Sequence, residues 1–169
     1  MVPVHHDQFY MRLALGLAEI GAASGEVPIG CVLVSGGRIR AMATNEVVQK
    51  QHPLYHAEWL AIDRAQRGMG RLRLPDATLY TTLEPCAMCA GAILLARIPR
   101  VVIAAMDAKR GCTGSIYNLL DDPAFNHRAE IRTGVLEAES SARLSGFFAA
   151  LRAQKKRARA ERNPSDGYS

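Results

Sequence analysis

Residues 78–105 read TLYTTLEPCAMCAGAILLARIPRVVIAA, and this stretch indicates how the chain folds. Its first five residues, Thr78–Thr82, carry the β-branched and aromatic side chains that favour a strand. Pro85 marks the start of a helix that continues to Ala96, because a proline at a helix start costs no hydrogen bond. A second apolar strand follows at residues 101–105. A strand, a helix and a strand within about 28 residues form a right-handed crossover, which predicts two parallel neighbouring strands.

The residues before this unit predict a helix and a hairpin. Residues 8–23 have the apolar spacing of an amphipathic helix. Two short apolar strands at 29–34 and 39–45 flank a glycine pair at 36–37, which suits the positive backbone angles of a tight turn. The helix is expected to bury a stripe of apolar residues three or four positions apart, namely Phe9, Leu13, Leu17 and Ile20.

The remaining segments complete a mixed sheet. A helix is expected from His56 to about Gln66, before the glycines at 68 and 70. Residues 130–135 predict a fifth strand, and the pattern is helical again from Glu137 to Asn163. This order of elements predicts a three-layer α/β/α fold, with a mixed five-stranded sheet and helices on both faces.

Three residues in this pattern are typical zinc ligands: His56, Cys86 and Cys89. The two cysteines are three positions apart at a helix start, so both sulfurs can reach one ion. A zinc ion with three protein ligands keeps its fourth position for water, which distinguishes a catalytic site from a closed structural site. Zinc lowers the pKa of that water toward neutrality. Glu58 is placed to carry the water's protons, so the pattern predicts hydrolytic attack on an electron-poor carbon.

Two other interpretations of these residues stay open. A Cys-x-x-Cys pair in an α/β protein can be a redox pair, although the aromatic-Cys-Gly-Pro-Cys form is missing here. A closed structural zinc site would need a fourth ligand, and the candidates are His52, Cys31 and Cys112. A structural site has no use for Glu58, and Cys31 lies in an apolar run that favours a core position.

The composition indicates one globular domain followed by a basic tail. The chain has 169 residues and a net charge of +5, and no apolar run is long enough to span a membrane. Residues 1–9 lack the apolar stretch of a secretory signal, so a cytoplasmic location is expected. We expect a zinc-dependent domain at 1–151 and a basic helical tail at 152–169. The segment 150–162 alone carries a net +5, which favours a polyanionic partner, with a solvated helix as the alternative.

The chain resembles the cytidine deaminase-like superfamily, and within it the tRNA-specific adenosine deaminases of the TadA type. The pattern H-x-E…P-C-x-x-C is the signature of zinc-dependent nucleobase deaminases. The resemblance covers roughly residues 9–156. Further stretches that carry it are Glu26-Val27-Pro28-Ile29-Gly30, Asn45, Thr82-Leu83-Glu84, Asp107-Ala108-Lys109, Gly111, Gly114-Ser115, Asn126-His127-Arg128 and Phe147-Phe148.

The resemblance implies a cytidine deaminase-like fold and hydrolysis of adenosine to inosine at the wobble position of a tRNA anticodon. It also implies a homodimer with one zinc ion per subunit. In the family pattern the His and the two Cys bind zinc and the Glu moves protons, which corresponds to His56, Cys86, Cys89 and Glu58. Further positions match residues that hold the flipped base, namely Asn45, Ile29, Leu83 and the backbone amide of Ala57.

Other residues are expected to contact the RNA. Asp107 could bind a ribose 2′-hydroxyl, which would distinguish RNA from DNA, or could cap an ordinary turn. Two departures from the family pattern weaken the local positive field, because Glu46 and Met106 stand where relatives commonly have a cation. The basic tail could compensate. The expected RNA contacts on the last helix are Phe147, Phe148, Arg152, Lys155 and Lys156.

Two other functions compete with this one. A deaminase of a free base or nucleoside shares the zinc chemistry but needs no basic tail. A catalytically silent subunit of a heterodimer often lacks the catalytic carboxylate, whereas Glu58 is present here. The sequence therefore favours the tRNA deaminase.

Overall fold

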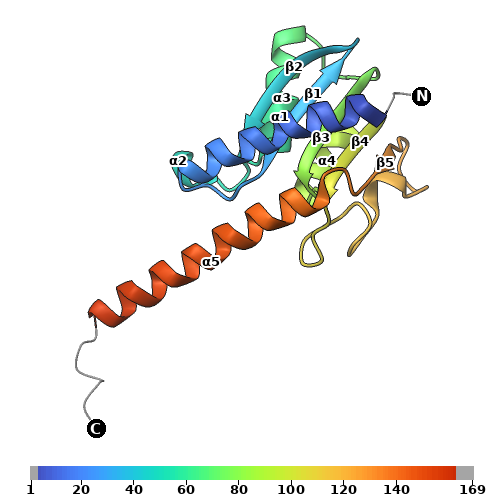
Figure 1. The fold of residues 1–169 in the computed structure, drawn as a ribbon. Coiled ribbons are helices and arrows are strands. Elements are labelled where there is room, and N and C mark those ends of the chain that lie inside the picture. Colours follow the sequence, from blue (N-terminus) through green and yellow to red (C-terminus); the bar gives the residue numbers. More distant parts are fainter. Residues whose placement is uncertain (1–3, 163–169) are drawn as a thin grey trace.

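The computed structural model describes residues 4–162, in which five strands form one mixed sheet (Figure 1). The strands follow the order β2-β1-β3-β4-β5. β1 pairs with β2 and β3 in antiparallel fashion, whereas β3, β4 and β5 are parallel to one another. The strands are β1 (Gly30–Ser35), β2 (Arg38–Thr44), β3 (Ala77–Leu83), β4 (Arg100–Ala105) and β5 (Glu130–Arg132). The mixed five-stranded sheet and the parallel β3–β4 pair are confirmed.

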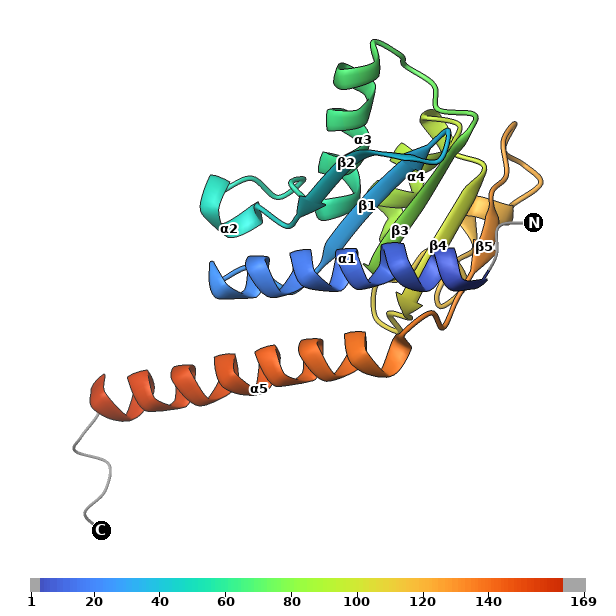
Figure 2. The same ribbon diagram turned by 45° about the horizontal axis from the view of Figure 1, so that its top comes forward.

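Helices cover both faces of this sheet, as expected (Figures 1 and 2). α1 and the start of α5 lie on one face, and α3 and α4 lie on the other. The helices are α1 (Val4–Ala23), α2 (Val47–Lys50), α3 (Ala57–Met69), α4 (Ala87–Leu95) and α5 (Glu137–Arg162), with a 3-10 turn η1 (Leu119–Asp121). The short elements α2 and η1 were not predicted, because neither shows an apolar period.

Side chains of the central strands alternate between two cores. In β1, Cys31 and Leu33 pack toward α3 and α4, whereas Val32 and Val34 pack toward α1. A strand covered on both faces reads as a continuous apolar run. The burial of Cys31 confirms its expected place in the core.

The hairpin between β1 and β2 is confirmed. Gly36 and Gly37 have φ angles of 59° and 70°, and Ser35 pairs with Arg38 across the turn. The fifth strand is shorter than the prediction of 130–135. The helix that follows His56 passes through Gly68 and ends at Gly70, whose φ of 61° suits a glycine.

The expected buried stripe of α1 is half right: Leu13 and Leu17 are partly buried and pack against the core, but the two ends of the stripe are not buried. Phe9 and Ile20 are 57% and 62% exposed. The buried stripe consists of Met11, Ala14, Leu15 and Ala18. Both stripes have helical spacing, so the sequence period alone could not choose between them. The rotation is set by the sheet: a Cβ on Gly30 would lie 1.9 Å from the carbonyl oxygen of Ala14, so this face of the helix approaches the β1 backbone directly.

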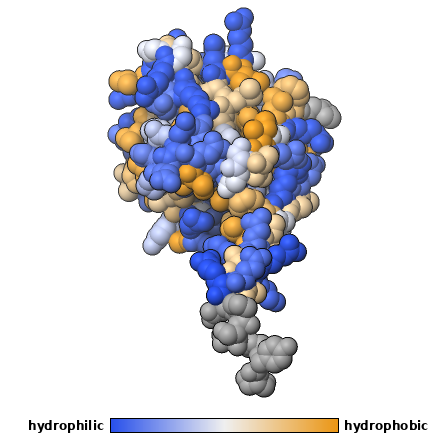
Figure 3. Space-filling model, turned by 90° about the vertical axis from the view of Figure 1, so that its left-hand side faces the viewer, coloured by the Kyte–Doolittle hydropathy of each residue, from blue (hydrophilic) through white to orange (hydrophobic). Residues whose placement is uncertain are grey.

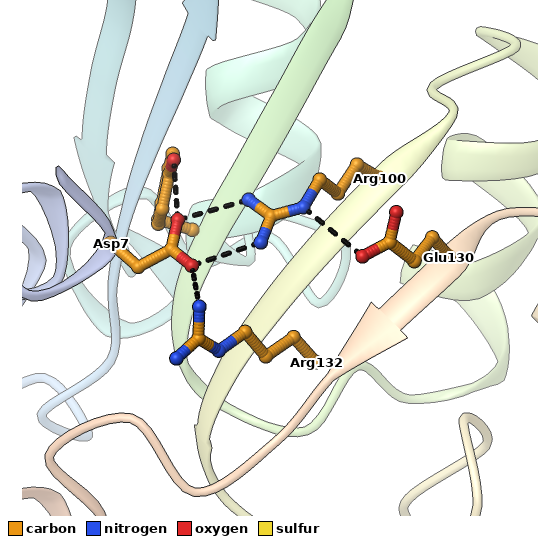
Figure 4. Close-up of polar contacts among 5 residues, drawn as sticks. Asp7, Arg100, Glu130 and Arg132 are labelled. Carbon is orange, nitrogen blue, oxygen red and sulfur yellow. Dashed lines mark hydrogen bonds and ion pairs between the residues drawn. The ribbon is translucent and has the colours of Figure 1, made fainter. Parts of the chain in front are cut away.

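An ion cluster fixes the start of α1 to β4 and β5 (Figure 4). Arg100 donates two hydrogen bonds of 2.9 Å to the buried carboxylate of Asp7, and Tyr80 donates one of 3.0 Å. Arg132 also donates to Asp7. Burial alone would raise the pKa of Asp7, but the hydrogen bonds from Arg100 and Tyr80 and the charges of both arginines lower it. Asp7 is therefore ionised in the folded chain.

α5 starts against the sheet and then leaves it (Figure 2). Near its start, the Ser140 hydroxyl donates a 2.6 Å hydrogen bond to the carbonyl oxygen of Thr82, and Arg143 donates to Glu19 of α1. Beyond residue 151 nearly every side chain is exposed. Figure 3 shows the end of α5 as a mainly hydrophilic projection beside the grey atoms. No helix among residues 4–162 combines the length and apolar character needed to cross a bilayer.

Candidate metal centre

Two helix starts bring the three predicted ligands together. His56 and Cys86 are the N-cap residues of α3 and α4, and both have extended backbones with φ near −74°. Cys89 lies one turn into α4. Amides in the first turn of a helix have no partner within the helix, so each helix start carries partial positive charge. This environment favours thiolate over thiol.

The ligating atoms form a compact group. His56 Nδ1 lies 3.6 Å from Cys86 Sγ and 3.5 Å from Cys89 Sγ. All three ligand atoms lie within 4.8 Å of one another, and across residues 4–162 no further His, Cys, Asp or Glu side chain joins this group. One imidazole and two thiol groups fit a zinc ion, with one tetrahedral position left over.

The residues considered as a fourth ligand lie elsewhere. His52 stacks on Tyr55 with ring centroids 4.2 Å apart, and its Nδ1 accepts a hydrogen bond from the amide of Leu54. Cys31 and Cys112 are buried outside the group. The described residues therefore form an open site rather than a closed one.

The pKa of one ligand, Cys86, suits a cation. Hydrogen bonds from Cys89 and His56 lower the pKa of Cys86 to about 3, although burial opposes this. The Cys86 thiol group is therefore a thiolate at neutral pH. The pKa values of Cys89 and His56 are raised, in both cases mainly by the hydrogen bond to Cys86. A bound cation would displace the thiol proton of Cys89.

Glu58 is a buried carboxyl group beside the metal group. It is 3% exposed, and Oε2 has no hydrogen-bond partner among the described residues. Burial raises the pKa of Glu58 to about 7, against the opposing effects of its own backbone hydrogen bond and the charge on His56. A carboxyl group with a pKa near neutrality can both accept and release a proton at physiological pH.

Three of the residues expected around a base, Asn45, Ile29 and Ala57, are joined by hydrogen bonds, and Ala57 follows His56 in the chain. The Asn45 side-chain oxygen accepts a 2.9 Å hydrogen bond from the backbone amide of Ala57, and the backbone amide of Asn45 donates to the carbonyl oxygen of Ile29. The amide of Ala57, which the resemblance places against the ring, is therefore taken by Asn45. Leu83 ends β3, three residues before Cys86, and is half-buried.

Asp107 caps a turn. Its Oδ1 accepts hydrogen bonds from the amides of Lys109 at 2.9 Å and Arg110 at 3.2 Å. Of the two roles considered for Asp107, Oδ1 therefore has the turn-capping one. The rest of the Asp107 side chain is partly exposed at the end of β4.

Sequence reasoning missed the structural roles of two buried carboxylates, Glu26 and Glu84. Glu26 Oε1 accepts hydrogen bonds of 2.8 Å from the amides of Val48 and Gln49, and so caps α2 between Asn45 and His56. Glu84 accepts hydrogen bonds from the loop after β4. Both residues stand among apolar and proline residues in the stretches that carry the resemblance. A carboxylate buried in such a setting needs hydrogen-bond donors, so its presence there could have indicated a structural role.

The structure reduces the expected effect of Glu46. Its side chain is 21% exposed and forms an ion pair with Arg64, which also donates a 2.9 Å hydrogen bond to the carbonyl oxygen of Met42. The charge of Glu46 is therefore compensated within the chain. Met106 is exposed and supplies no charge.

The predicted RNA contacts of α5 are separate from the metal group. Phe147 and Phe148 form an edge-to-face pair with ring centroids 5.6 Å apart, and both are half-buried. The cations beyond them are exposed on the projecting part of the helix; those expected to contact RNA are Arg152, Lys155 and Lys156. They do not line the metal site itself.

Comparisons with known proteins all point to deaminases. The profile of the MafB19-like deaminase family matches residues 5–152. A tRNA-specific adenosine deaminase of Bacillus subtilis strain 168 is 50% identical over 153 residues, which cover 90% of this chain and 95% of the relative. The enzyme of the same name from Haemophilus influenzae is 44% identical, over 89% of this chain and 87% of the relative.

A solved structure is also similar. It comes from a study of A-to-I editing by tRNA:A34 deaminases at the wobble position of transfer RNA. It superposes with a TM-score of 0.78 at 40% identity, and the match covers 80% of this chain and 99% of that one.

Proposed function

We propose that this chain hydrolyses adenosine to inosine at the wobble position of a tRNA anticodon. It belongs to the MafB19-like deaminase family, and its relatives at 44–50% identity are tRNA-specific adenosine deaminases. The observation that carries this proposal is the pairing of an open His-Cys-Cys group with a buried, unpartnered carboxyl oxygen on Glu58. A redox pair or a structural metal site would have no use for that carboxyl group.

The metal in this proposal is zinc, held by His56, Cys86 and Cys89. When bound there, zinc would supply the Lewis-acid chemistry that makes a hydroxide nucleophile available at neutral pH. The donor set supports zinc over magnesium or calcium, which prefer oxygen ligands.

Glu58 would move the protons. Its Oε2 would accept the proton that the attacking water loses and pass it to a ring nitrogen of adenine. The same carboxyl group would then take the remaining proton of the added hydroxyl and deliver it to the amine. The C–N bond breaks, ammonia leaves and the C=O of inosine forms. The raised pKa of Glu58, about 7, suits a group that must take up and release a proton in each turnover.

The base would lie against apolar walls and one amide. Ile29 and Leu83 would line its faces, and Asn45 would read its edge, as an amide side chain can do with a purine. Ala57 would act by fixing Asn45, because its amide N–H holds the Asn45 side-chain oxygen. This leaves Nδ2 of Asn45 as the group that can donate to the base. Asp107 would contact the ribose through its second carboxylate oxygen.

The substrate would reach the site as an unstacked base in the anticodon loop, which costs little to extrude. Phe147, Phe148 and the tail cations Arg152, Lys155 and Lys156 would contact the RNA beyond the loop. We further propose a homodimer with one zinc ion per subunit and a cytoplasmic location, where tRNA is processed. Residues 1–151 would form the deaminase domain and 152–169 the tail.

The test is an inosine assay with zinc-loaded protein and an anticodon stem-loop that carries a wobble adenosine. Inosine should appear with wobble adenosine and should be absent when another base replaces it. Turnover of free guanine or cytosine, with no product from the stem-loop, would refute the tRNA assignment and favour a deaminase of free bases.

A further inference from the structure

A buried carboxylate that the proposed chemistry does not use holds the loop after β4. Glu84 is 3% exposed and lies between β3 and α4. Its Oε2 accepts a 2.9 Å hydrogen bond from the amide of Asp107 and another from the Ser115 hydroxyl. Its Oε1 accepts from the amides of Thr113 and Ser115, both at 3.0 Å, and from the Thr113 hydroxyl at 3.3 Å. All these donors belong to residues 107–115.

The loop also approaches Glu84 without room for a side chain. A Cβ on Gly111 would lie 2.0 Å from Oε2 of Glu84 and 2.6 Å from the carbonyl oxygen of Asp107. The next residue, Cys112, donates a 2.9 Å backbone hydrogen bond to the carbonyl oxygen of Pro85. The loop is therefore fixed to the residues that lead directly into Cys86.

Glu84 thus joins two parts of the site. Along the chain it stands two residues before Cys86, a proposed metal ligand. Through space it holds the amide of Asp107, whose side chain is the proposed ribose contact. An ionised carboxylate only accepts hydrogen bonds, and its partners here are all able to donate. Backbone hydrogen bonds from Glu84 to Ala105 and from Gly111 to Asp107 also hold this segment, and the Glu84 side chain adds the contact to the amide of Asp107 itself.

We propose that Glu84 is a positioning residue for substrate binding, which acts by holding Asp107 at a fixed place beside the metal group. This inference rests on the proposed function, because it assigns Asp107 to the substrate.

The geometry predicts what an isosteric change would do. In Glu84→Gln, the side-chain NH₂ must replace one of the two oxygens. At the Oε1 position it would meet two backbone amides and the Thr113 hydroxyl, whereas at the Oε2 position it would meet one amide and the Ser115 hydroxyl. Only one amide would then face the NH₂ at Oε2. The second arrangement is favoured, so the hydrogen bond lost is the one from the amide of Asp107.

The experiment compares zinc-loaded wild type, Glu84→Gln, Asp107→Ala and the double variant on the anticodon stem-loop. The loss of a hydrogen bond to a charged group predicts that each single variant raises KM about tenfold or more, with a smaller change in kcat. The double variant should have nearly the KM of Asp107→Ala, because both changes act through the same contact of Asp107 with the ribose. Zinc content should stay at the wild-type level.

Two further variants separate positioning from folding. Gly111→Ala keeps the charge of Glu84 but pushes the loop away from it, and should reproduce the KM increase. Asp7→Asn is the matched control, because Asp7 is a buried, hydrogen-bonded carboxylate at the Arg100 end of β4, whereas Glu84 and Asp107 lie at the Ala105 end. It should lower thermal stability and leave KM unchanged.

Several results would overturn the inference. One is a Glu84→Gln protein that loses stability but keeps the wild-type KM; another is independent, additive effects of Glu84→Gln and Asp107→Ala. Loss of zinc in proportion to lost activity would place the effect at Cys86 instead. Failure of the proposed function is a different outcome, since the wild type itself would then make no inosine.

Discussion

The Glu58 carboxyl group is buried, carries one oxygen without a partner, and has a pKa raised to about 7 by its burial. A buried polar atom without a partner is costly unless a ligand or water completes it. A substrate or water in the site could satisfy Oε2. This unfavourable burial of Oε2 occurs next to the three ligating atoms, which is consistent with a role for Glu58 in catalysis.

Replacing this carboxyl group should separate binding from chemistry. Glu58→Gln should keep a full complement of zinc, because the three ligands are untouched. Turnover should fall by about 100- to 10,000-fold, the usual contribution of a general acid–base. Metal analysis and single-turnover inosine formation measure the two quantities. Activity close to that of the wild type would show that another group carries the protons.

At the scale of single residues, the sequence predicted the groups whose relative positions follow from local chain geometry. His56, Cys86 and Cys89 could be grouped because each lies at a predicted helix start, where the chain geometry is nearly fixed. The partners of Glu84 lie 23 to 31 residues away along the chain. No local pattern encodes that contact. The same holds for the bond between Asn45 and Ala57, which redirects an amide that the resemblance had given to the base.

At the scale of elements, packing of α1 on β1 decides which side of the helix is buried. The apolar period allowed two stripes, and the close approach of Ala14 to Gly30 selects one. The other stripe leaves Phe9 and Ile20 exposed. The fold class could be predicted because strand and helix periods differ, whereas the rotation of a helix depends on contacts between elements.

Two glycines test this packing in opposite directions. Gly30→Ala should destabilise the protein by about 1–3 kcal/mol, because its Cβ would overlap the Ala14 carbonyl and force α1 off the sheet. Gly16 lies in α1 with nothing within 4 Å of an added Cβ, so Gly16→Ala should stabilise by about 0.5–1 kcal/mol. Urea unfolding of both variants measures the free energies. Equal effects of the two substitutions would contradict the packing argument.

The Asp7 cluster makes the attachment of α1 sensitive to acid. The pKa of Asp7 is lower in the folded chain than its ordinary value, so its contribution to stability is complete above about pH 4. That contribution is lost as the pH falls through the folded-state pKa. Asp7→Asn should cost about 3–5 kcal/mol at neutral pH, because it leaves Arg100 and Arg132 without their buried partner.

The same variant should also have a flatter dependence of unfolding free energy on pH in the acid range. Urea unfolding at a series of pH values measures this slope. If wild type and Asp7→Asn lose stability in parallel as the pH falls, Asp7 is not the group that titrates.

At the scale of the whole molecule, the basic segment lies apart from the metal-binding residues. The segment 150–162 carries a net charge of +5, equal to that of the entire chain, and most of it lies on the part of α5 that projects from the domain. The sequence predicted this helix and its charge. It could not predict the direction of the helix. That direction is set near the helix start by the hydrogen bond from Ser140 to Thr82 and by the ion pair between Arg143 and Glu19.

Truncation after Leu151 tests whether this projection binds RNA. The shortened protein should bind the stem-loop more weakly, and the logarithm of its affinity should fall less steeply with the logarithm of salt concentration. Each lost phosphate contact should reduce the slope by about 0.7–0.9. Filter binding at several salt concentrations measures this. An unchanged slope would mean that the cations only keep the helix solvated.

The attachment of α5 to β3 fixes a length as well as a direction. An α-helix rises about 1.5 Å per residue, so Arg152 and Arg162 lie about 18 and 33 Å along the axis from Ser140. Ser140 is bonded to Thr82, four residues before Cys86. The cations of α5 therefore extend to about 33 Å along the helix axis from a contact on β3. A tRNA that occupied the proposed site and also reached Arg162 would have to span the distance between the two.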